Sequence, residues 1–133
     1  MLAPGELVTG IRIPAQPAGC VQSYLKFRIR NAIDFPIVGV ATVFSVENGR
    51  FTRARVALGA VAPVPLRVRE VEQFLVGRKP DEETAEVAAS IAVRGAQPLA
   101  GNSFKLAIVQ ALVKKAILGA AAYPVAGKGG ALP

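Results

Sequence analysis

Few side chains in this sequence have the types and spacing that catalysis requires. The chain has 133 residues, with Cys20 as its one cysteine and with no histidine. This composition excludes a disulfide framework, every Cys/His zinc pattern and any Ser-His-Asp or Cys-His pair within the chain. Cys20 lies among Pro, Ala and Gly without a basic neighbour, so we interpret it as an unreactive thiol.

The remaining candidates for chemistry also have structural explanations. Glu82 and Glu83 follow Asp81, a typical helix N-cap residue, and negative charge in a first turn is favoured by the helix dipole. The segment "AGKGG" near the end of the chain resembles a phosphate-binding loop only superficially, because no Ser or Thr follows its lysine and a predicted helix precedes it. The sequence therefore predicts no catalytic residue and no metal site.

A row of cations on one predicted strand is a better candidate for binding. In residues 24–30, "YLKFRIR", apolar and polar side chains alternate with the period of a half-buried strand. One face carries Leu25, Phe27 and Ile29, and the other carries Tyr24, Lys26, Arg28 and Arg30. Arg53 and Arg55 add cations on a second strand. This pattern is typical of a solvated or docking face, with nucleic-acid binding as the alternative.

The charge balance supports an anionic partner. The net charge is +7 and the pI about 10.2; residues 1–69 hold nine basic and three acidic side chains, whereas residues 70–133 hold seven and six. Nucleic acid, a phosphate-bearing cofactor, acidic lipid and acidic protein all remain open as partners. Sheet-based RNA readers place stacking aromatics on the binding face, and here only Tyr24 shares the face of Lys26. A basic nucleic-acid-binding or adaptor module is therefore the alternative function.

The elements that position these residues follow from the sequence pattern. Residues 6–14 alternate as a strand and form an arm before "PAQPAGC". Two β-rich runs meet at Asn48-Gly49, a pair typical of a type I′ hairpin turn. Gly39 and Gly59, one in each run, indicate a bulge or a close backbone approach.

Three helices follow the strands. We expect the first to begin at Pro65, with Val68, Val71 and Leu75 on its apolar face, and to end at Gly77. The second runs over about residues 81–93, and the third begins near Asn102 or Ser103 and stops at Pro124. The third is apolar nearly all round, which indicates cover on more than one side. The predicted fold class is α+β, with a three-stranded antiparallel sheet followed by three helices.

Length and composition predict one domain without a membrane span. The chain is 52% hydrophobic, enough for a modest core. Its most apolar segment, residues 104–122, has Lys114 and Lys115 at its centre, and each lysine costs about 2.5–3.5 kcal/mol at mid-bilayer. Pro4, Gly5 and Glu6 interrupt the opening segment, so no secretory leader is expected. We expect a cytoplasmic protein.

Three segments carry a resemblance to a known family: "LAPGELVTGIRIP", "YLKFRIRNAIDFPIVGVATVF" and "GRFTRARVALGAVAPVPLRVREVEQFLVGRKPDEE". In this order, over about residues 2–118, they resemble the end of the flavin domain and the C-terminal domain of the FAD-binding medium subunit of molybdenum hydroxylases. That family includes xanthine dehydrogenase and aerobic carbon monoxide dehydrogenase. The resemblance implies a non-catalytic domain that covers part of the flavin and helps dock subunits of an oxidoreductase.

The same resemblance implies partners. In this family a large subunit holds molybdopterin and hydroxylates the substrate, a small subunit carries two [2Fe–2S] clusters, and FAD passes electrons to the final acceptor. The implied assembly is a hetero-oligomer, with a dimer of the whole assembly as one form. The substrate, the acceptor and the stoichiometry are not encoded in this chain.

The resemblance also implies the cofactor-binding residues. Leu7 and Val8 match two consecutive apolar residues that contact FAD, with core packing as the alternative. Lys26 matches a lysine near the flavin, where a cation would stabilise negative charge on the reduced ring, and its alternative is membership of the basic strand face. Asp34 matches a position before the hairpin, and we assign it to loop ordering.

One departure from the family concerns the FAD pyrophosphate. The medium subunit is usually longer, and its N-terminal half supplies glycine-rich loops that are not found in this chain. We expect residues 1–14 to complete a neighbouring FAD domain, residues 15–123 to form the flavoprotein C-terminal domain, and residues 124–133 to be a flexible tail. A split subunit is favoured over a truncation, because the apolar third helix and the arm would otherwise expose much apolar surface.

Overall fold

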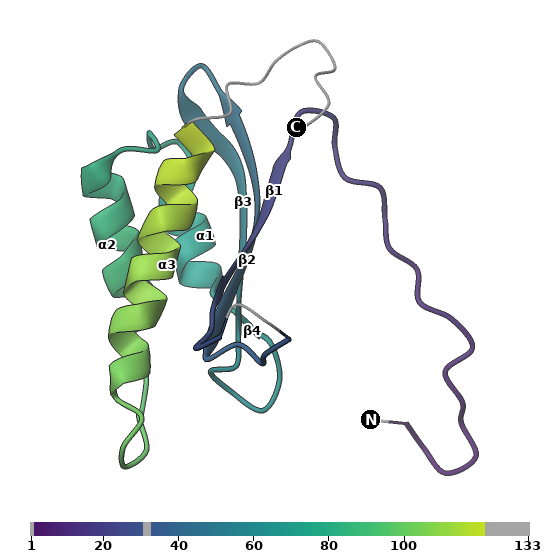
Figure 1. Ribbon diagram of the computed structural model, residues 1–133. Helices are drawn as coiled ribbons and strands as arrows, with labels where there is room; N and C mark the ends of the chain where they lie inside the picture. Colours follow the sequence, from purple (N-terminus) through teal and green to yellow (C-terminus); the bar gives the residue numbers. More distant parts are fainter. Residues whose placement is uncertain (1, 31–32, 122–133) are drawn as a thin grey trace.

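The computed structural model describes residues 2–30 and 33–121, and in this part of the chain three helices cover one face of a four-stranded antiparallel sheet (Figure 1). The strands lie in sequence order: β1 (Val21–Phe27), β2 (Val38–Glu47), β3 (Arg50–Gly59) and β4 (Leu66–Arg67). The helices are α1 (Arg69–Leu75), α2 (Glu82–Ala92) and α3 (Phe104–Ala121). The predicted α+β class is confirmed, with one more strand than expected.

The central hairpin forms where the sequence predicts it. Asn48 and Gly49 have φ angles of 51° and 72°, the two positive values that a type I′ turn needs. The β2–β3 register shifts between Ser45 and Val46, so a bulge at the glycines is not found. Gly39 and Gly59 instead lie opposite each other, and the close neighbour of Gly39 is the ring of Tyr24.

The core lies between the sheet and the helices. Alternate residues of β2 and β3 point toward the helices, as expected for strands with one covered face. Phe44 and Phe51 form its centre, with ring centroids 5.1 Å apart and the planes tilted by 56°. The largest fully buried side chains are Phe44, Phe51, Leu75, Ile117, Val38, Val40, Val56, Val71 and Val113.

The first strand is shifted relative to its prediction. It spans Val21–Phe27 rather than residues 24–30, and pairs with β2 from Val21↔Phe44 to Phe27↔Val38. The chain leaves the sheet after Phe27, so Ile29, expected on the packed face, is 82% exposed. Alternation alone marked a strand but not its ends, which depend on how far β2 extends beside it.

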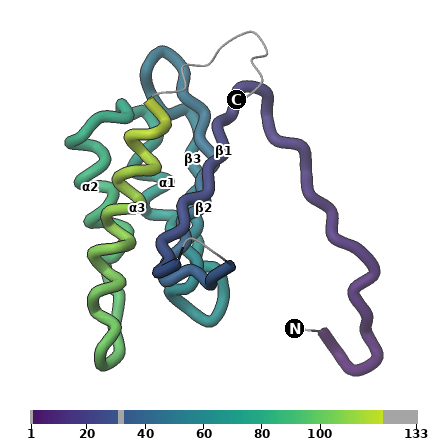
Figure 2. Tube along the Cα trace, viewed as in Figure 1, coloured from purple at the N-terminus to yellow at the C-terminus, as the bar shows by residue number. Residues whose placement is uncertain are grey.

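The arm is not a strand. Residues 6–14 form no strand in the structure, and this segment runs away from the sheet (Figures 1 and 2). An extended segment becomes a strand only when a neighbouring strand pairs with it, and none does so here. The strand prediction for residues 6–14 is therefore wrong for this chain in isolation.

The segment after the hairpin differs from its prediction. Pro65 does not begin a helix. Leu66 and Arg67 form β4 opposite Leu58 and Ala57, and α1 begins only at Arg69. Two residues are too few to show a strand period in the sequence, which is why this strand was missed.

The other helices agree with their predictions. Asp81 caps α2, its carboxylate accepting from the Thr84 N–H at 3.0 Å. Helix α3 contacts α2, β1 and β2, which confirms the expectation that an apolar helix is covered on more than one side. The predicted stop at Pro124 and the predicted tail lie outside the described residues.

Candidate functional site

The connection between β1 and β2 fixes the side chain of Lys26, the cation on β1 that the resemblance places near a flavin. Lys26 follows Tyr24 on the sheet face opposite the helices, at the end of β1. Its ammonium donates a hydrogen bond to the backbone carbonyl of Asp34. The half-buried side chain is thus fixed against the β1–β2 connection rather than extended into solvent.

Asp34 orders this connection. Its carboxylate accepts from the Phe35 N–H at 3.0 Å, and from the Arg30 N–H at 3.2 Å and guanidinium Nη2 at 3.3 Å. The side-chain and backbone hydrogen bonds from Arg30 lower the pKa of Asp34 below its ordinary value. The prediction that Asp34 orders the loop is confirmed by these contacts.

The structure does not bring Leu7 and Val8, the other two residues predicted to contact the cofactor, together with Lys26. Leu7 is 85% exposed and Val8 is 67% exposed, and both lie on the arm that runs away from the sheet (Figure 2). Core packing within this chain, the alternative considered for them, is thereby excluded. Their assignment to flavin contact stays a prediction.

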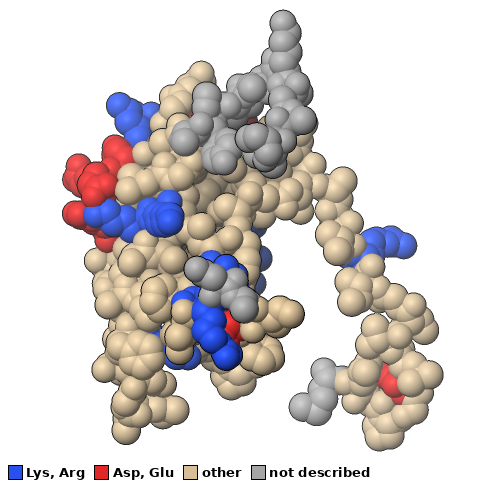
Figure 3. Space-filling view, in the orientation of Figure 1, with Lys and Arg blue, Asp and Glu red and all other residues tan. Residues whose placement is uncertain are grey.

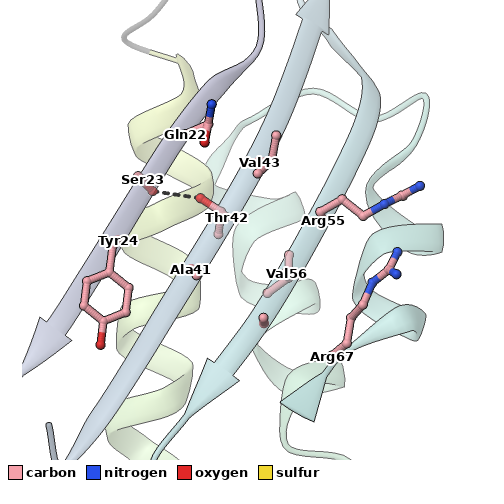
Figure 4. Close-up of a pocket in the computed structure, with 10 residues that line it drawn as sticks. Gln22, Ser23, Tyr24, Ala41, Thr42, Val43, Arg55, Val56 and Arg67 are labelled. Atoms are coloured by element: carbon pink, nitrogen blue, oxygen red, sulfur yellow. Dashed lines mark hydrogen bonds between the residues drawn. The ribbon is translucent and has the colours of Figure 1, made fainter. Parts of the chain in front are cut away.

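The sheet face opposite the helices contains a shallow hollow of about 510 Å³ (Figure 4). It crosses β1, β2 and β3 and reaches Arg67 on β4. Its floor consists of small side chains such as Ala41 and Ala57, and Tyr24 borders it on β1. A Cβ on Gly39 would lie 2.7 Å from the Tyr24 hydroxyl, so glycine leaves room for this ring.

A cluster of two arginines around one carboxylate, at the far border of the hollow, was not predicted. Glu72, on α1, accepts two hydrogen bonds of 2.8 Å from the Arg67 guanidinium and one of 3.0 Å from the Val56 N–H. Arg55 Nη1 lies 3.6 Å from the same carboxylate. In the sequence, the only indication of this cluster was the spacing of Arg67 and Glu72 near the start of a predicted helix.

The electrostatics of this cluster keep Glu72 ionised. Burial by itself raises the pKa of Glu72, but the hydrogen bonds from Arg67 and Val56 and the charges of Arg67 and Arg55 outweigh it, so that the pKa is lowered. The hydrogen bond to Glu72 correspondingly raises the pKa of Arg67. One buried carboxylate therefore holds two guanidinium groups at the surface, with one positive charge in excess.

Glu82 and Glu83, the carboxylate candidates from the sequence, lie in the first turn of α2, as predicted. Glu82 also forms an ion pair with Lys114 on α3, as does Glu86 at 3.0 Å, so these charges connect two helices. Cys20 is a half-buried free thiol directly before β1. Within residues 2–30 and 33–121, no group of three or more Cys, Asp or Glu side chains is arranged to hold a metal ion.

None of the described helices is both long and apolar enough to span a bilayer.

Comparison with known proteins identifies the family. Residues 22–120 match the CO dehydrogenase flavoprotein C-terminal domain. The chain belongs to this family. The match runs from the second residue of β1 to the second-last residue of α3. This domain of the family therefore accounts for all four strands and all three described helices.

Individual relatives agree with this assignment. The xanthine dehydrogenase FAD-binding subunit of Escherichia coli O157:H7 is 30% identical over 117 residues, which cover 84% of this chain and 40% of that protein. The carbon monoxide dehydrogenase medium chain of Afipia carboxidovorans is 34% identical over 91 residues, 68% of this chain and 31% of the relative. The chain thus spans two fifths or less of these two proteins.

Solved structures have the same fold. A Cu,Mo-CO dehydrogenase in its cyanide-inactivated form matches with a TM-score of 0.82 and 28% identity, over 92% of this chain and 44% of that chain. Quinoline 2-oxidoreductase from Pseudomonas putida 86 matches with a TM-score of 0.73 and 32% identity, over 84% and 39%. The CO dehydrogenase flavoprotein C-terminal fold is therefore shared across enzymes named for different substrates.

Proposed function

We propose that this chain acts as the C-terminal domain of the FAD subunit of a xanthine dehydrogenase-like molybdenum hydroxylase. In this role it covers one side of the flavin and docks the flavin domain to the rest of the enzyme. The family match over residues 22–120 carries the proposal. The named relatives support it, since they include an FAD-binding subunit and a medium chain.

The residues of this chain are suited to cover the flavin ring of FAD but not to bind its phosphates. The chain offers two exposed apolar side chains, Leu7 and Val8, and an ammonium, Lys26, held at the end of β1. It has no glycine-rich phosphate loop that follows a strand. A flavin domain must therefore supply the pyrophosphate site, and FAD bound there would supply the electron transfer.

Each of the three side chains has a defined task in this proposal. Lys26 holds positive charge beside the flavin ring, and the Asp34 carbonyl fixes the position of its ammonium. Leu7 and Val8 lie on the exposed arm, and we propose that the arm becomes a strand by pairing with the flavin domain, which would place them against the ring. Their exposure in the isolated chain is consistent with such a partner.

The proposed assembly contains two further subunits. A large subunit would hold molybdopterin and hydroxylate the substrate, and a small subunit would carry [2Fe–2S] clusters between molybdenum and FAD. We place the assembly in the cytoplasm as a hetero-oligomer. Matching solved structures support the molybdenum part of this composition, since one is a Cu,Mo-CO dehydrogenase and another is a carbon monoxide dehydrogenase that lacks the Mo-pyranopterin moiety of its molybdenum cofactor.

Purification from the native host tests the proposal. The chain is tagged at its C-terminus, and the copurified material is analysed by native mass spectrometry and by its flavin absorbance. We expect flavin, an iron–sulfur protein and a large molybdopterin protein to be recovered with the tagged polypeptide. Recovery of a lone 13.8 kDa species, or of one bound to nucleic acid, would contradict the proposed function.

The role of Lys26 has a test of its own in the same purified complex. Replacing it as Lys26→Met removes a cation beside the ring, so the midpoint potential of the flavin should become more negative. Arg28→Met is the matched control, since Arg28 is exposed beyond the end of β1. Equal potentials in wild type and Lys26→Met would assign Lys26 to loop ordering alone.

A further inference from the structure

The sheet face that the helices leave uncovered has a candidate binding site for an anionic group at the border of its hollow. Arg55 and Arg67 extend side by side from β3 and β4 (Figure 4), and both guanidinium groups are held by Glu72. We propose that this face docks a protein partner that places a carboxylate side chain on Arg55 and Arg67. The inference goes beyond the proposed function, which assigns Lys26 on this face to the flavin but assigns no partner to Arg55 and Arg67.

The hydrogen bonds of the cluster leave donors for a second carboxylate. Arg67 uses Nε and Nη2 on Glu72, and Arg55 uses Nη1 on the Ala54 carbonyl at 2.8 Å. Among the described residues, Arg67 Nη1 and Arg55 Nε and Nη2 have no partner. The side chains of Arg55 and Arg67 are 47% and 46% exposed, so these donors reach solvent.

Fixing the two guanidinium groups in advance favours binding. A free arginine loses rotamer freedom when it binds a carboxylate, whereas Glu72 has already ordered this pair. Since the Glu72 side chain is only 6% exposed, a partner cannot take its place easily and binds instead to the outer donors. The single carboxylate also balances only one of the two charges, which leaves a net attraction for an anion.

The charge distribution of the whole domain specifies an acidic partner. Residues 21–67 contain seven cations, Lys26, Arg28, Arg30, Arg50, Arg53, Arg55 and Arg67, and two carboxylates, Asp34 and Glu47. Acidic side chains instead gather over α2, on the helix side (Figure 3). A partner that presents carboxylates is therefore attracted more strongly to the sheet side than to the helix side.

The floor of the hollow favours a protein over a phosphate-bearing chain. Ala41, Val43 and Ala57 are small apolar residues that can contact the methylene groups of a glutamate or a neighbouring aliphatic side chain. Nucleic-acid binding by a sheet uses aromatic side chains for base stacking. Among the residues that the structure describes, Tyr24 is the one aromatic residue that borders the hollow, and its ring lies close to Gly39 on the strand surface.

Binding of a defined probe to the full chain tests this inference. An acetylated hexapeptide of glutamate is titrated into the ¹⁵N-labelled chain, and the Nε–Hε signals of Arg55 and Arg67 are followed by NMR. We expect saturable shifts of both signals. The variant Arg55→Gln, which keeps the Arg67–Glu72 pair, should weaken binding at least fivefold, whereas Arg28→Gln should change it less than twofold.

Three results would overturn the inference: no shift of the Arg55 and Arg67 signals, equal weakening by Arg55→Gln and Arg28→Gln, or tighter binding of a thymidine hexanucleotide at the same signals. The unfolding midpoint of each variant is measured to confirm that the variant folds. The titration of the wild-type chain tests the inference even where a variant fails to fold. Because the peptide assay needs no flavin domain, its failure is distinct from failure of the proposed function.

Discussion

Glu72 connects helix α1 to the sheet through a single carboxylate. The fourth strand pairs with β3 only at Ala57 and Leu58, so the edge of β3 beyond them has no strand beside it. Glu72 accepts the Val56 N–H there, as a strand carbonyl would. A buried N–H without a partner costs about 1–3 kcal/mol, so this carboxylate replaces part of a missing strand.

The variant Glu72→Gln tests this role. A neutral amide cannot balance the two arginines, so at pH 7 the free energy of unfolding should fall by about 1–3 kcal/mol. The folded state lowers the pKa of Glu72 from its ordinary 4.5, so the stabilisation is present above that pH and is lost as the pH falls through the lowered pKa. The difference between wild type and Glu72→Gln should therefore shrink below about pH 4.5 in urea unfolding.

A matched control for this experiment is Glu70→Gln, on the same helix. Glu70 is 67% exposed and its ion pair with Arg94 is 3.9 Å long. The control should change stability by less than about 0.5 kcal/mol at any pH. A pH-independent loss in Glu72→Gln would contradict the assignment.

Gly49 is required by the turn it occupies. Its φ of 72° lies in the left-handed region, where a Cβ is unfavourable. Gly49→Ala should lower the free energy of unfolding by about 1–2 kcal/mol. Gly59→Ala is the control with the same chemical change, because a Cβ there meets only the Gly39 carbonyl oxygen at 3.9 Å. Thermal unfolding of the two variants should show a loss in Gly49→Ala alone.

At the scale of elements, the edge of β3 is protected near the hairpin as well as beside β4. Near the hairpin, the Phe51 N–H donates to the Arg78 carbonyl at 2.9 Å, and the Gly77 N–H donates to the Phe51 carbonyl at 2.8 Å. The segment after α1 thus occupies the edge that β4 is too short to cover. Exposed strand edges promote association with other chains, and this arrangement removes one of them.

Helix α2 depends on its N-cap. Replacing Asp81 by alanine leaves the Thr84 N–H without its acceptor and should lower the free energy of unfolding by about 1 kcal/mol. Asparagine offers the same acceptor oxygen, so Asp81→Asn should stay within about 0.5 kcal/mol of wild type. Chemical denaturation followed by circular dichroism measures both, and equal losses would assign the effect to charge rather than to capping.

At the scale of the whole molecule, the arm and the folded domain are separable. Leu7, Val8, Ile11 and Ile13 are each at least 67% exposed, so residues 2–14 contribute little to the core. Deleting residues 2–14 should leave the thermal unfolding midpoint unchanged within about 2 °C.

The same deletion should abolish recovery of the flavin domain in the purification described above, because the arm is proposed to pair with it. Leu7→Ser combined with Val8→Ser is the milder variant, and it should reduce the retained flavin without changing the midpoint. Full recovery of flavin after the deletion would show that the arm has no part in assembly.

Several features were determined by the sequence alone, because each rests on contacts between near neighbours in the chain. The Asn48-Gly49 turn, the Asp81 cap and the apolar third helix all depend on residues within a few positions of one another. The α+β class follows from their order. Lys26 was also identified as a residue of interest, through its position in a strand that resembles a family segment.

Other features were decided only by the tertiary structure, because they join residues distant in the sequence. Strand β4 exists because two residues reach β3, and residues 6–14 form no strand because none lies beside them. Arg55 and Glu72 are 17 positions apart and meet only when α1 packs on the sheet. No local pattern in the sequence encodes this contact, whereas folding brings Glu72 to Arg55 and Arg67, which border one hollow.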